Sequence, residues 1–590
     1  MNEPQFNDTV ATTELERDER VDELQRQLGA IIVQERGYNE LSDDRKGAVD
    51  EVLRSLSSMR FEDRASLERV ARNLLGAVAP ELEKYVSIAL DTAAKHMART
   101  RGVLVIYTGG TIGSAPRDMN DPDSPQVVKP WKVLKNASPQ LGLLGYPVDA
   151  IAFVEPLDSC NVGPQHWRTM ARIIAKYHNE YEGFVILHGT DSMVYTASAL
   201  SFMLVDLAKP VVITGAQLAG IASPRNDAHQ NIITAIMLAN PAANKLHPIP
   251  EVLIAFGNVI SRGNRTKKVD VIGYQGFRSL NYPLLGIAGE YVSIERKHVR
   301  AMPETDLQLF DQLDTNVIML EVFPGMQHSS ILENILRDEN LRGVVLKSYG
   351  AGNIPTDPPF LNLFKSFIDR GGVVVNVTSV PQGEVVMGLY ETSQILLDRG
   401  IIGGFDLTPE AALCKLMMLI GTYGKDVDKV KRLMQQSLAG EQRLSLETTD
   451  YPGEGRVDGV TKHTELVKQQ LFSVTDVERI EKVMLRLKGA RLEPGATERA
   501  TVRLFIDDGF PVGTFRRGKV PAQALVKDDT VGESLVFDLT PYKERFVGKA
   551  GSGRIAASQK IGFTIEFEPR GDGYLAWDAA ELNIYTTELT

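Results

Sequence analysis

Residues 101–113, RGVLVIYTGGTIG, are the stretch that decides the fold of this chain. A short apolar run passes directly into paired glycines there, and runs of similar form recur in GFVILHGTD (183–191), PVVITGAQ (210–217) and VLIAFGNV (252–259). A helix-length segment separates each run from the next. Short apolar runs that alternate with helical segments predict a parallel β-sheet with crossover helices.

A second series of this kind follows a break near residues 296–315, and it includes GVVLKSY (343–349) and GVVVNVTS (372–379). The first hundred residues instead repeat apolar positions at the helical spacing of three and four, whereas the last hundred alternate apolar and polar positions. The predicted parts are an all-helical region over 1–98, α/β domains over 99–300 and 316–440, a polar linker or excursion over 441–478 and a β-sandwich-like domain over 479–590.

Composition excludes several classes of partner. The chain holds 65 Lys and Arg against 76 Asp and Glu, so its formal net charge is −11 and it has no overall basic field for nucleic acid or an anionic membrane. Two cysteines, Cys160 and Cys414, are too few for a disulfide framework or a four-thiolate zinc site. The first twenty residues lack the pattern of a secretory signal, and no apolar run approaches the roughly 20 residues that span a bilayer. We therefore expect a cytoplasmic protein with no membrane or nucleic-acid partner.

Hydroxyl, carboxylate and ammonium groups follow the apolar runs of the first series. Thr111 comes after the first run, Thr190 and Asp191 come after the second, and Lys268 ends the basic segment RGNRTKK (262–268). In open α/β sheets, ligands bind beyond the carboxyl ends of the strands, which is where these groups are predicted to lie. Each has a plainer interpretation when taken alone: a turn with a capping threonine, a helix N-cap for Asp191 and a solvated loop for the basic segment.

Taken together, TGGTIG, Asp158-Ser159, HGTDSM, ITGAQ and RGNRTKK, in this order, resemble the L-asparaginase/glutaminase amidohydrolase family, and in detail its type I cytoplasmic branch. The resemblance extends from residue 101 to about 440, where SYGAGNIP (348–355) and GVVVNVTS also match. It implies a two-domain α/β core with parallel sheets and crossover helices. The helical N-terminal region and the β-rich C-terminal region lie outside it and are additions to the family's plan.

By this resemblance, Thr111 is the nucleophile, and its hydroxyl attacks the side-chain amide carbon of asparagine or a closely related small amide. Ammonia leaves, and water hydrolyses the acyl-enzyme. Thr190, Asp191 and Lys268 match the family's proton relay. A threonine hydroxyl needs an adjacent base, and a lysine serves as one only when burial or positive neighbours lower its pKa. A nearby Asp191 would oppose that shift, so the three residues are assigned as a relay without naming Lys268 as the sole base.

The resemblance also assigns the substrate contacts. Backbone N–H groups of the turn at Gly110, with Gly189 and Thr190 opposite, are expected to bind the oxyanion. Ser159, followed by Cys160, matches the serine that binds the α-carboxylate, and Asp191 receives the α-amino group. The family requires no metal or organic cofactor and assembles as homodimers or homotetramers, in which the second domain can reach a neighbour's site. Asn353 is the matching residue, and a turn asparagine is the alternative interpretation.

Two departures from the family pattern keep a second function open. Active relatives carry a tyrosine in a mobile segment soon after TGGTI, whereas here the segment that follows, residues 114–145, contains no tyrosine before Tyr146. Cys160 stands where the family has a more polar residue. The alternative hypothesis is therefore an asparaginase-like protein that binds an amino acid as a sensor, with little or no turnover.

Overall fold

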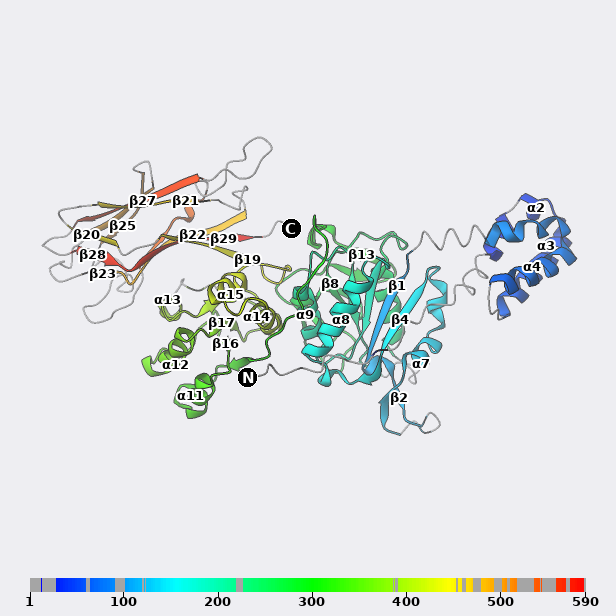
Figure 1. Ribbon diagram of the computed structural model, residues 1–590, viewed down its shortest axis with the longest axis horizontal. Helices are drawn as coiled ribbons and strands as arrows, with labels where there is room; N and C mark the ends of the chain where they lie inside the picture. The colour runs from blue at the N-terminus through cyan, green and yellow to red at the C-terminus, as the bar shows by residue number, and fades with distance from the viewer. Residues whose placement is uncertain are drawn as a thin grey trace. The chain divides into compact units, whose positions relative to one another are not determined.

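The computed structural model divides into two compact units, residues 1–279 with 283–311 and residues 280–282 with 312–590 (Figure 1). Each unit is described by itself. The structure describes residue 12, residues 28–90 except 35 and 60–63, residues 101–451 except 119–120, 122–123, 219–225, 386 and 388–390, and then residues 455–458, 463–470, 479–492, 501–506, 510–516, 535–541, 543, 559–568 and 574–587.

The first unit begins with the helical region that the three-and-four spacing predicts. Its helices include α2 (Arg36–Asn39), α3 (Asp43–Ser58), α4 (Arg64–Val78) and α5 (Pro80–Glu83), and residues 28–34 and 85–90 are also helical. Two acidic residues occupy the first turn of α3 and complement its dipole, and a proline opens α5, where its missing N–H leaves no bond unmade. The apolar stripes of these helices form one cluster of buried Leu, Val and Ala side chains. The predicted helical addition is therefore confirmed over the described part of residues 28–90, whereas residues 1–11, 13–27 and 91–98 of the predicted region lie outside the described residues.

The core of this unit is an eight-stranded sheet in the order β13-β12-β9-β8-β7-β5-β1-β4. The five strands from β8 to β4 are parallel, as predicted. Their bounds are β1 (Val103–Gly109), β4 (Val148–Leu157), β5 (Gly183–Leu187), β7 (Val211–Thr214) and β8 (Val252–Phe256), and the antiparallel edge consists of β9 (Val259–Arg262), β12 (Gly286–Ala288) and β13 (Val292–Ile294). Every residue of β1 is buried, because a central parallel strand is covered on both faces.

The strand order places a topological switch at β1. The chain runs from β1 to β4 on one side and then returns to β5 on the other side. At such a reversal the connecting loops diverge and leave a crevice beyond the carboxyl ends of the strands. The crossover helices are α8 (Pro164–Tyr177), α9 (Met193–Met203) and α10 (Ala228–Ala239), and α10 packs on β5, β7 and β8. Figure 1 shows α8 and α9 beside this sheet.

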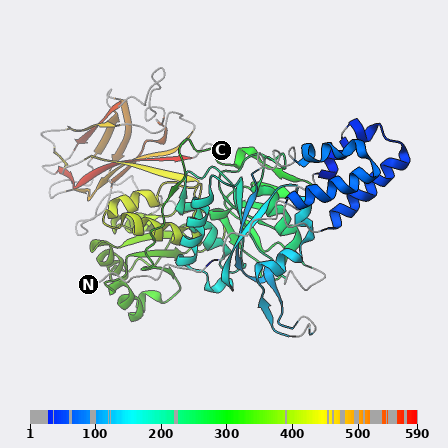
Figure 2. The same cartoon turned by 45° about the vertical axis from the view of Figure 1, so that its right-hand side comes forward.

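A two-stranded hairpin leaves the sheet directly after β1. A 3₁₀ turn, η1 (Thr111–Gly113), leads into β2 (Ser114–Pro116), which pairs antiparallel with β3 (Gln126–Val128). Helix α7 (Trp131–Asn136) follows. Figure 2 shows this hairpin as an arm that extends away from the eight-stranded sheet.

The second unit contains the second α/β series and the β-rich region. Its parallel sheet has the order β15-β16-β17-β18, with bounds β15 (Val317–Glu321), β16 (Gly343–Ser348), β17 (Val373–Thr378) and β18 (Ile402–Gly403). The helices of this series are α11 (Ser330–Arg337), α12 (Pro358–Asp369), α13 (Glu391–Asp398), α14 (Pro409–Tyr423) and α15 (Val427–Met434). A two-domain α/β core with parallel sheets is therefore confirmed, while the exact domain boundaries stay predictions.

The C-terminal β-region forms three antiparallel sheets, β19-β29-β22-β26, β20-β28-β23 and β21-β27-β24-β25. The interpretation of 441–478 as a linker or excursion is wrong, because it contains the strands β19 (Leu444–Tyr451), β20 (Gly455–Asp458) and β21 (His463–Gln470). These pair with β29 (Ala579–Thr587), β28 (Tyr574–Trp577) and β27 (Gln559–Glu568). In β19, LSLETTDY, only Leu444, Thr449 and Tyr451 are buried, and most of the other residues are polar. Its sequence therefore lacks the apolar run that would predict a strand. The remaining strands are β22 (Ile480–Lys488), β23 (Arg491–Leu492), β24 (Thr501–Ile506), β25 (Phe510–Arg516) and β26 (Leu535–Asp538).

Apolar and charged contacts join the β-region to the α/β part of the same unit. Phe405 forms a buried cluster with Leu444 and Tyr585, and the Phe405 and Tyr585 rings meet edge to face at 6.2 Å between centroids. The guanidinium of Arg486 in β22 pairs with Asp398 at the end of α13, and both side chains are about nine-tenths buried. The two parts therefore share a core.

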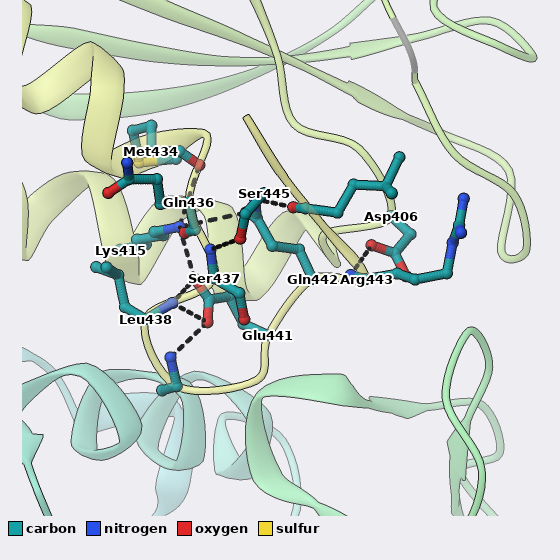
Figure 3. Close-up of polar contacts among 12 residues, drawn as sticks. Asp406, Lys415, Met434, Gln436, Ser437, Leu438, Glu441, Gln442, Arg443 and Ser445 are labelled. Atoms are coloured by element: carbon teal, nitrogen blue, oxygen red, sulfur yellow. Dashed lines mark hydrogen bonds and ion pairs between the residues drawn. The ribbon is translucent and has the colours of Figure 1, made fainter. Parts of the chain in front are cut away.

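A fully buried ion pair fixes the connection from α15 to β19. The Lys415 ammonium on α14 lies 2.5 Å from a carboxylate oxygen of Glu441, and both side chains are 0% exposed (Figure 3). Lys415 also donates to the carbonyls of Met434, at 3.1 Å, and Gln436, at 2.5 Å. Burial opposes ionisation of Glu441, but the Lys415 ammonium and backbone N–H groups outweigh it and lower the pKa of this carboxyl.

Glu441→Gln should lower the free energy of unfolding by about 3 kcal/mol, because it leaves the Lys415 ammonium buried without a counter-charge. Urea unfolding at pH 7 measures the loss. Asp369→Asn, which breaks the solvent-exposed pair with Lys365 in the same unit, is the control and should change stability little. Equal effects of the two substitutions would contradict the prediction.

Candidate active site

Three loops meet at the carboxyl ends of β1, β5 and β4. A Cβ atom added at Gly110, after β1, would lie only 2.4 Å from the backbone N and Cα atoms of Gly189, after β5. A Cβ added at Gly189 would lie 2.7 Å from the side chain of Ser159, after β4. Both positions therefore require glycine, because a side-chain carbon would overlap the Gly189 backbone in the first case and the Ser159 side chain in the second. The loops predicted to carry the site are in direct contact.

The turn after β1 has a backbone that only glycine adopts readily. Gly109 and Gly110 have φ angles of +120° and +85°. Thr111 then begins the 3₁₀ turn, in which the Gly113 N–H donates to the Gly110 carbonyl at 3.1 Å. This conformation places Thr111 next to the residue that lies against Gly189. Thr111 therefore lies directly beyond the carboxyl end of β1, and its role as nucleophile stays a prediction.

Lys268 joins the two polar residues that follow β5. Its ammonium donates to the Thr190 hydroxyl oxygen at 2.9 Å and to a carboxylate oxygen of Asp191 at 2.7 Å. The Lys268 side chain is 17% exposed and that of Asp191 is 65% exposed, so the ion pair lies at the protein surface with its carboxylate open to solvent. The structure therefore brings together the three residues assigned to the relay.

Ser159 supports the same loop from β4. It is buried, and its hydroxyl oxygen accepts the Asp191 N–H at 3.1 Å. The Ser192 hydroxyl donates to the Ser159 carbonyl at 2.5 Å, a contact that sequence reasoning missed although Ser192 stands inside HGTDSM. Cys160, the next residue, is exposed. The loop after β5 is therefore bonded to Ser159 twice, through the Ser159 hydroxyl and through its carbonyl.

His188 precedes these residues and is a buried part of the scaffold. Its Nδ1 lies 2.6 Å from the Gly189 carbonyl, and its Nε2 lies 2.9 Å from the Thr196 hydroxyl. A carbonyl only accepts, so Nδ1 carries the proton and Nε2 accepts from Thr196. Complete burial lowers the pKa of His188 to about 4. The imidazole is therefore neutral near pH 7 and holds the Gly189 carbonyl in place.

The strand that carries Lys268 is fixed by its own contacts. Lys268 ends β10 (Thr266–Lys268), which pairs antiparallel with β11 (Phe277–Ser279). Before β10, the Arg262 guanidinium lies 2.5 Å from a Glu251 carboxylate oxygen, and both side chains are 3% exposed. The ammonium of Lys268 is thus delivered by an anchored segment, which contradicts the plainer interpretation of 262–268 as a solvated loop.

Asn353 is the one predicted site residue that lies in the second unit. It closes a turn in which its N–H donates to the Tyr349 carbonyl at 2.9 Å and its carbonyl accepts from the Tyr349 N–H at 3.0 Å. Its role in substrate binding stays a prediction. Within the described residues, no helix is long and apolar enough to cross a membrane, and no group of three or more His, Cys, Asp or Glu side chains could hold a metal ion.

Comparisons with known proteins match this core. The family described as "Asparaginase, N-terminal" matches residues 102–300, and "Glutaminase/Asparaginase C-terminal domain" matches residues 316–434. L-asparaginase 1 of Escherichia coli K12 is 37% identical over 345 residues, which are 58% of this chain and 98% of that protein. A mouse protein named 60 kDa lysophospholipase is 34% identical over 374 residues, 60% of this chain and 64% of its own length. The crystal structure of L-asparaginase I from Vibrio cholerae aligns with a TM-score of 0.52 and 33% identity, over 58% of this chain and 99% of that one.

The neutral state of His188 makes stability depend on pH. Between its folded pKa of about 4 and the ordinary value of about 6.5, the unfolded chain binds a proton that the folded chain does not. Stability should therefore fall as the pH falls through this window, by about 2 kcal/mol from pH 7 to pH 5 for this group. Urea unfolding at both pH values, compared with His188→Gln, isolates the contribution. An identical pH dependence in the two proteins would contradict it.

Proposed function

The chain belongs to the asparaginase family of amidohydrolases, and we propose that it hydrolyses the side-chain amide of L-asparagine, or of a closely related small amide, to the acid and ammonia. The observation that carries the proposal is the contact of Lys268 with both Thr190 and Asp191, beside the turn that presents Thr111. Relatives named L-asparaginase align over nearly their whole length.

Thr111 is the proposed nucleophile. Its hydroxyl oxygen attacks the amide carbon, and the hydroxyl proton passes through Thr190 and Lys268 to the departing nitrogen, which leaves as ammonia. The product of this step is an ester between the substrate acyl group and Thr111. A water molecule then attacks the ester carbon, its proton returns to the Thr111 oxygen, and the acid is released. The hydrogen bond from Lys268 to Thr190 supports this route, because protons move along hydrogen bonds of such length.

Backbone N–H groups stabilise the charge that develops on the amide oxygen. The Gly110 and Gly189 backbones approach so closely that a Cβ added at Gly110 would lie 2.4 Å from the Gly189 backbone. Donors fixed in this way before the reaction need no reorganisation as the oxyanion forms, and one such donor is typically worth about 3 kcal/mol of barrier. The glycine pair thus supports the proposed oxyanion site.

The α-carboxylate and α-amino groups of the substrate are assigned to Ser159 and Asp191. The exposed side chain of Asp191 leaves one of its carboxylate oxygens outside the 2.7 Å contact with Lys268, so it can accept an ammonium from the substrate. Cys160 lies exposed beside Ser159 and lines the same end of β4. Cytoplasmic location, assembly as a homodimer or homotetramer and a contribution of Asn353 to a neighbour's site remain part of the proposal.

Thr111→Ala and Lys268→Met should each lower kcat/KM for asparagine by at least ~1,000-fold, because residues that act as one catalytic unit lose most of its effect singly. Ammonia release measures activity on asparagine, glutamine and related amides. Thr169→Ala is the matched control, since its exposed hydroxyl donates to the Gln165 carbonyl of its own helix at 3.0 Å. This variant should keep wild-type activity.

The same purified wild-type protein also tests the alternative hypothesis of an amino-acid-binding protein. Wild-type protein that releases no ammonia from any of these amides, yet gains thermal stability from asparagine, would replace the hydrolase proposal with the amino-acid-binding one. The hairpin segment without a tyrosine is the feature that motivates this comparison.

A further inference from the structure

The base of the β2–β3 hairpin lies against a buried phenol. Tyr107, in β1, is 0% exposed, and its hydroxyl donates to the Lys129 carbonyl at 2.6 Å. Lys129 is the residue directly after β3. The Tyr107 ring also contacts the buried ring of Trp131, the first residue of α7, at 6.0 Å between centroids. The phenol therefore bonds the point where the hairpin returns to the domain.

The same phenol fills the space under the nucleophile turn. A Cβ atom added at Gly113 would lie 1.8 Å from the Tyr107 hydroxyl oxygen, so the phenol and the Gly113 backbone are in direct contact. The Lys129 N–H donates to the Gly113 carbonyl at 2.9 Å. Gly113 ends the turn that Thr111 begins. Each of these three residues therefore contacts the other two, and together they join the hairpin to the turn: Tyr107, Lys129 and Gly113.

The described residues of the hairpin are most buried at its base. All three residues of β2 are buried, while β3 begins exposed at Gln126 and the adjoining Arg117 is exposed. Ser114 reinforces the base, because its hydroxyl donates to the Gly110 carbonyl at 3.2 Å. Burial raises the pKa of the Tyr107 phenol, so its hydroxyl stays a donor across the working pH range of a protein.

We propose that Tyr107 is a positioning residue for the amidohydrolase reaction, which sets the orientation of the Thr111 turn and the base of the β2–β3 hairpin through its bond to the Lys129 carbonyl. The inference rests on the proposed function. Tyr107 lies within β1 beneath the turn, so it acts through Lys129 and Gly113 and not on the substrate. A small rotation of the turn changes the angle at which the Thr111 oxygen approaches the amide carbon, and reaction rates are sensitive to such errors.

Tyr107→Phe removes the donor and keeps the ring. It should lower kcat for asparagine roughly ten-fold and change KM less than about two-fold, since alignment is lost and ground-state binding is kept. Amide hydrogen exchange should become faster in peptides that cover residues 113–129. Gly113→Ala, which displaces the phenol from the other side, should shift kcat and exchange in the same direction.

Tyr146→Phe is the matched control. Tyr146 is also buried, and its hydroxyl also donates to a backbone carbonyl, that of Ile236 at 3.4 Å. This variant should lose stability without changing kcat or the exchange of 113–129. Wild-type exchange of 113–129 in Tyr107→Phe would overturn the inference, and so would an equal fall of kcat in Tyr146→Phe. If the wild-type protein releases no ammonia, the proposed function fails, and the exchange measurement alone decides whether Tyr107 holds the hairpin.

Discussion

The absence of a side chain at Gly110 and Gly189 is the constraint on which the site depends. A Cβ added at Gly110 would lie 2.4 Å from the Gly189 backbone, and one added at Gly189 would lie 2.7 Å from the Ser159 side chain, so a larger residue at either position would force these loops apart. Their approach occurs at the switch between β1 and β5, where the sheet topology already opens a crevice. Ser159 reaches the same point because the pairing of β4 with β1 shifts register between Tyr107 and Gly109, which brings Leu157 opposite Gly109. Sheet order and glycine contact together bring Gly110, the residue before Thr111, against Gly189, the residue before Thr190.

Two lysine–carboxylate pairs in this chain show how burial separates a structural contact from a chemical one. Lys415 and Glu441 are both fully buried, and the ammonium also donates to two backbone carbonyls and to the Gln442 amide oxygen in the α14–β19 region. Such a pair holds one geometry, because separating the charges is costly in a low dielectric. Lys268 is partly exposed and its partner Asp191 mostly exposed, so water and substrate can reach them. Only the second pair can exchange protons and partners during a reaction.

The sequence predicts those strands whose residues form an unbroken apolar run that ends in a turn residue. Strands β1, β5, β7 and β8 are continuous apolar runs that end in glycine or small polar residues, and all four were expected. Strand β4 is not predicted, because Asp149, Glu155 and Pro156 interrupt its apolar run; the buried Asp149 carboxylate accepts the Tyr181 hydroxyl at 2.7 Å. Thr111, Thr190, Asp191, Ser159 and Lys268 came from their resemblance to a family motif. Ser192 and Tyr107 could not come from spacing, since their hydroxyls bond to carbonyls of Ser159 and Lys129 that are distant along the chain.

The C-terminal β-region is part of the second unit and not a detachable module. Its first strand, β19, begins three residues after Glu441, whose carboxylate neutralises a lysine in the α/β part. Removing the chain from residue 441 onward would leave the Lys415 ammonium buried without a counter-charge and would uncover Phe405, which Leu444 and Tyr585 now cover. Both losses act on the α/β part itself, so a shortened chain would carry an unpaired charge and an open apolar face. The added strands therefore contribute to the stability of the domain that they follow, whatever else they bind.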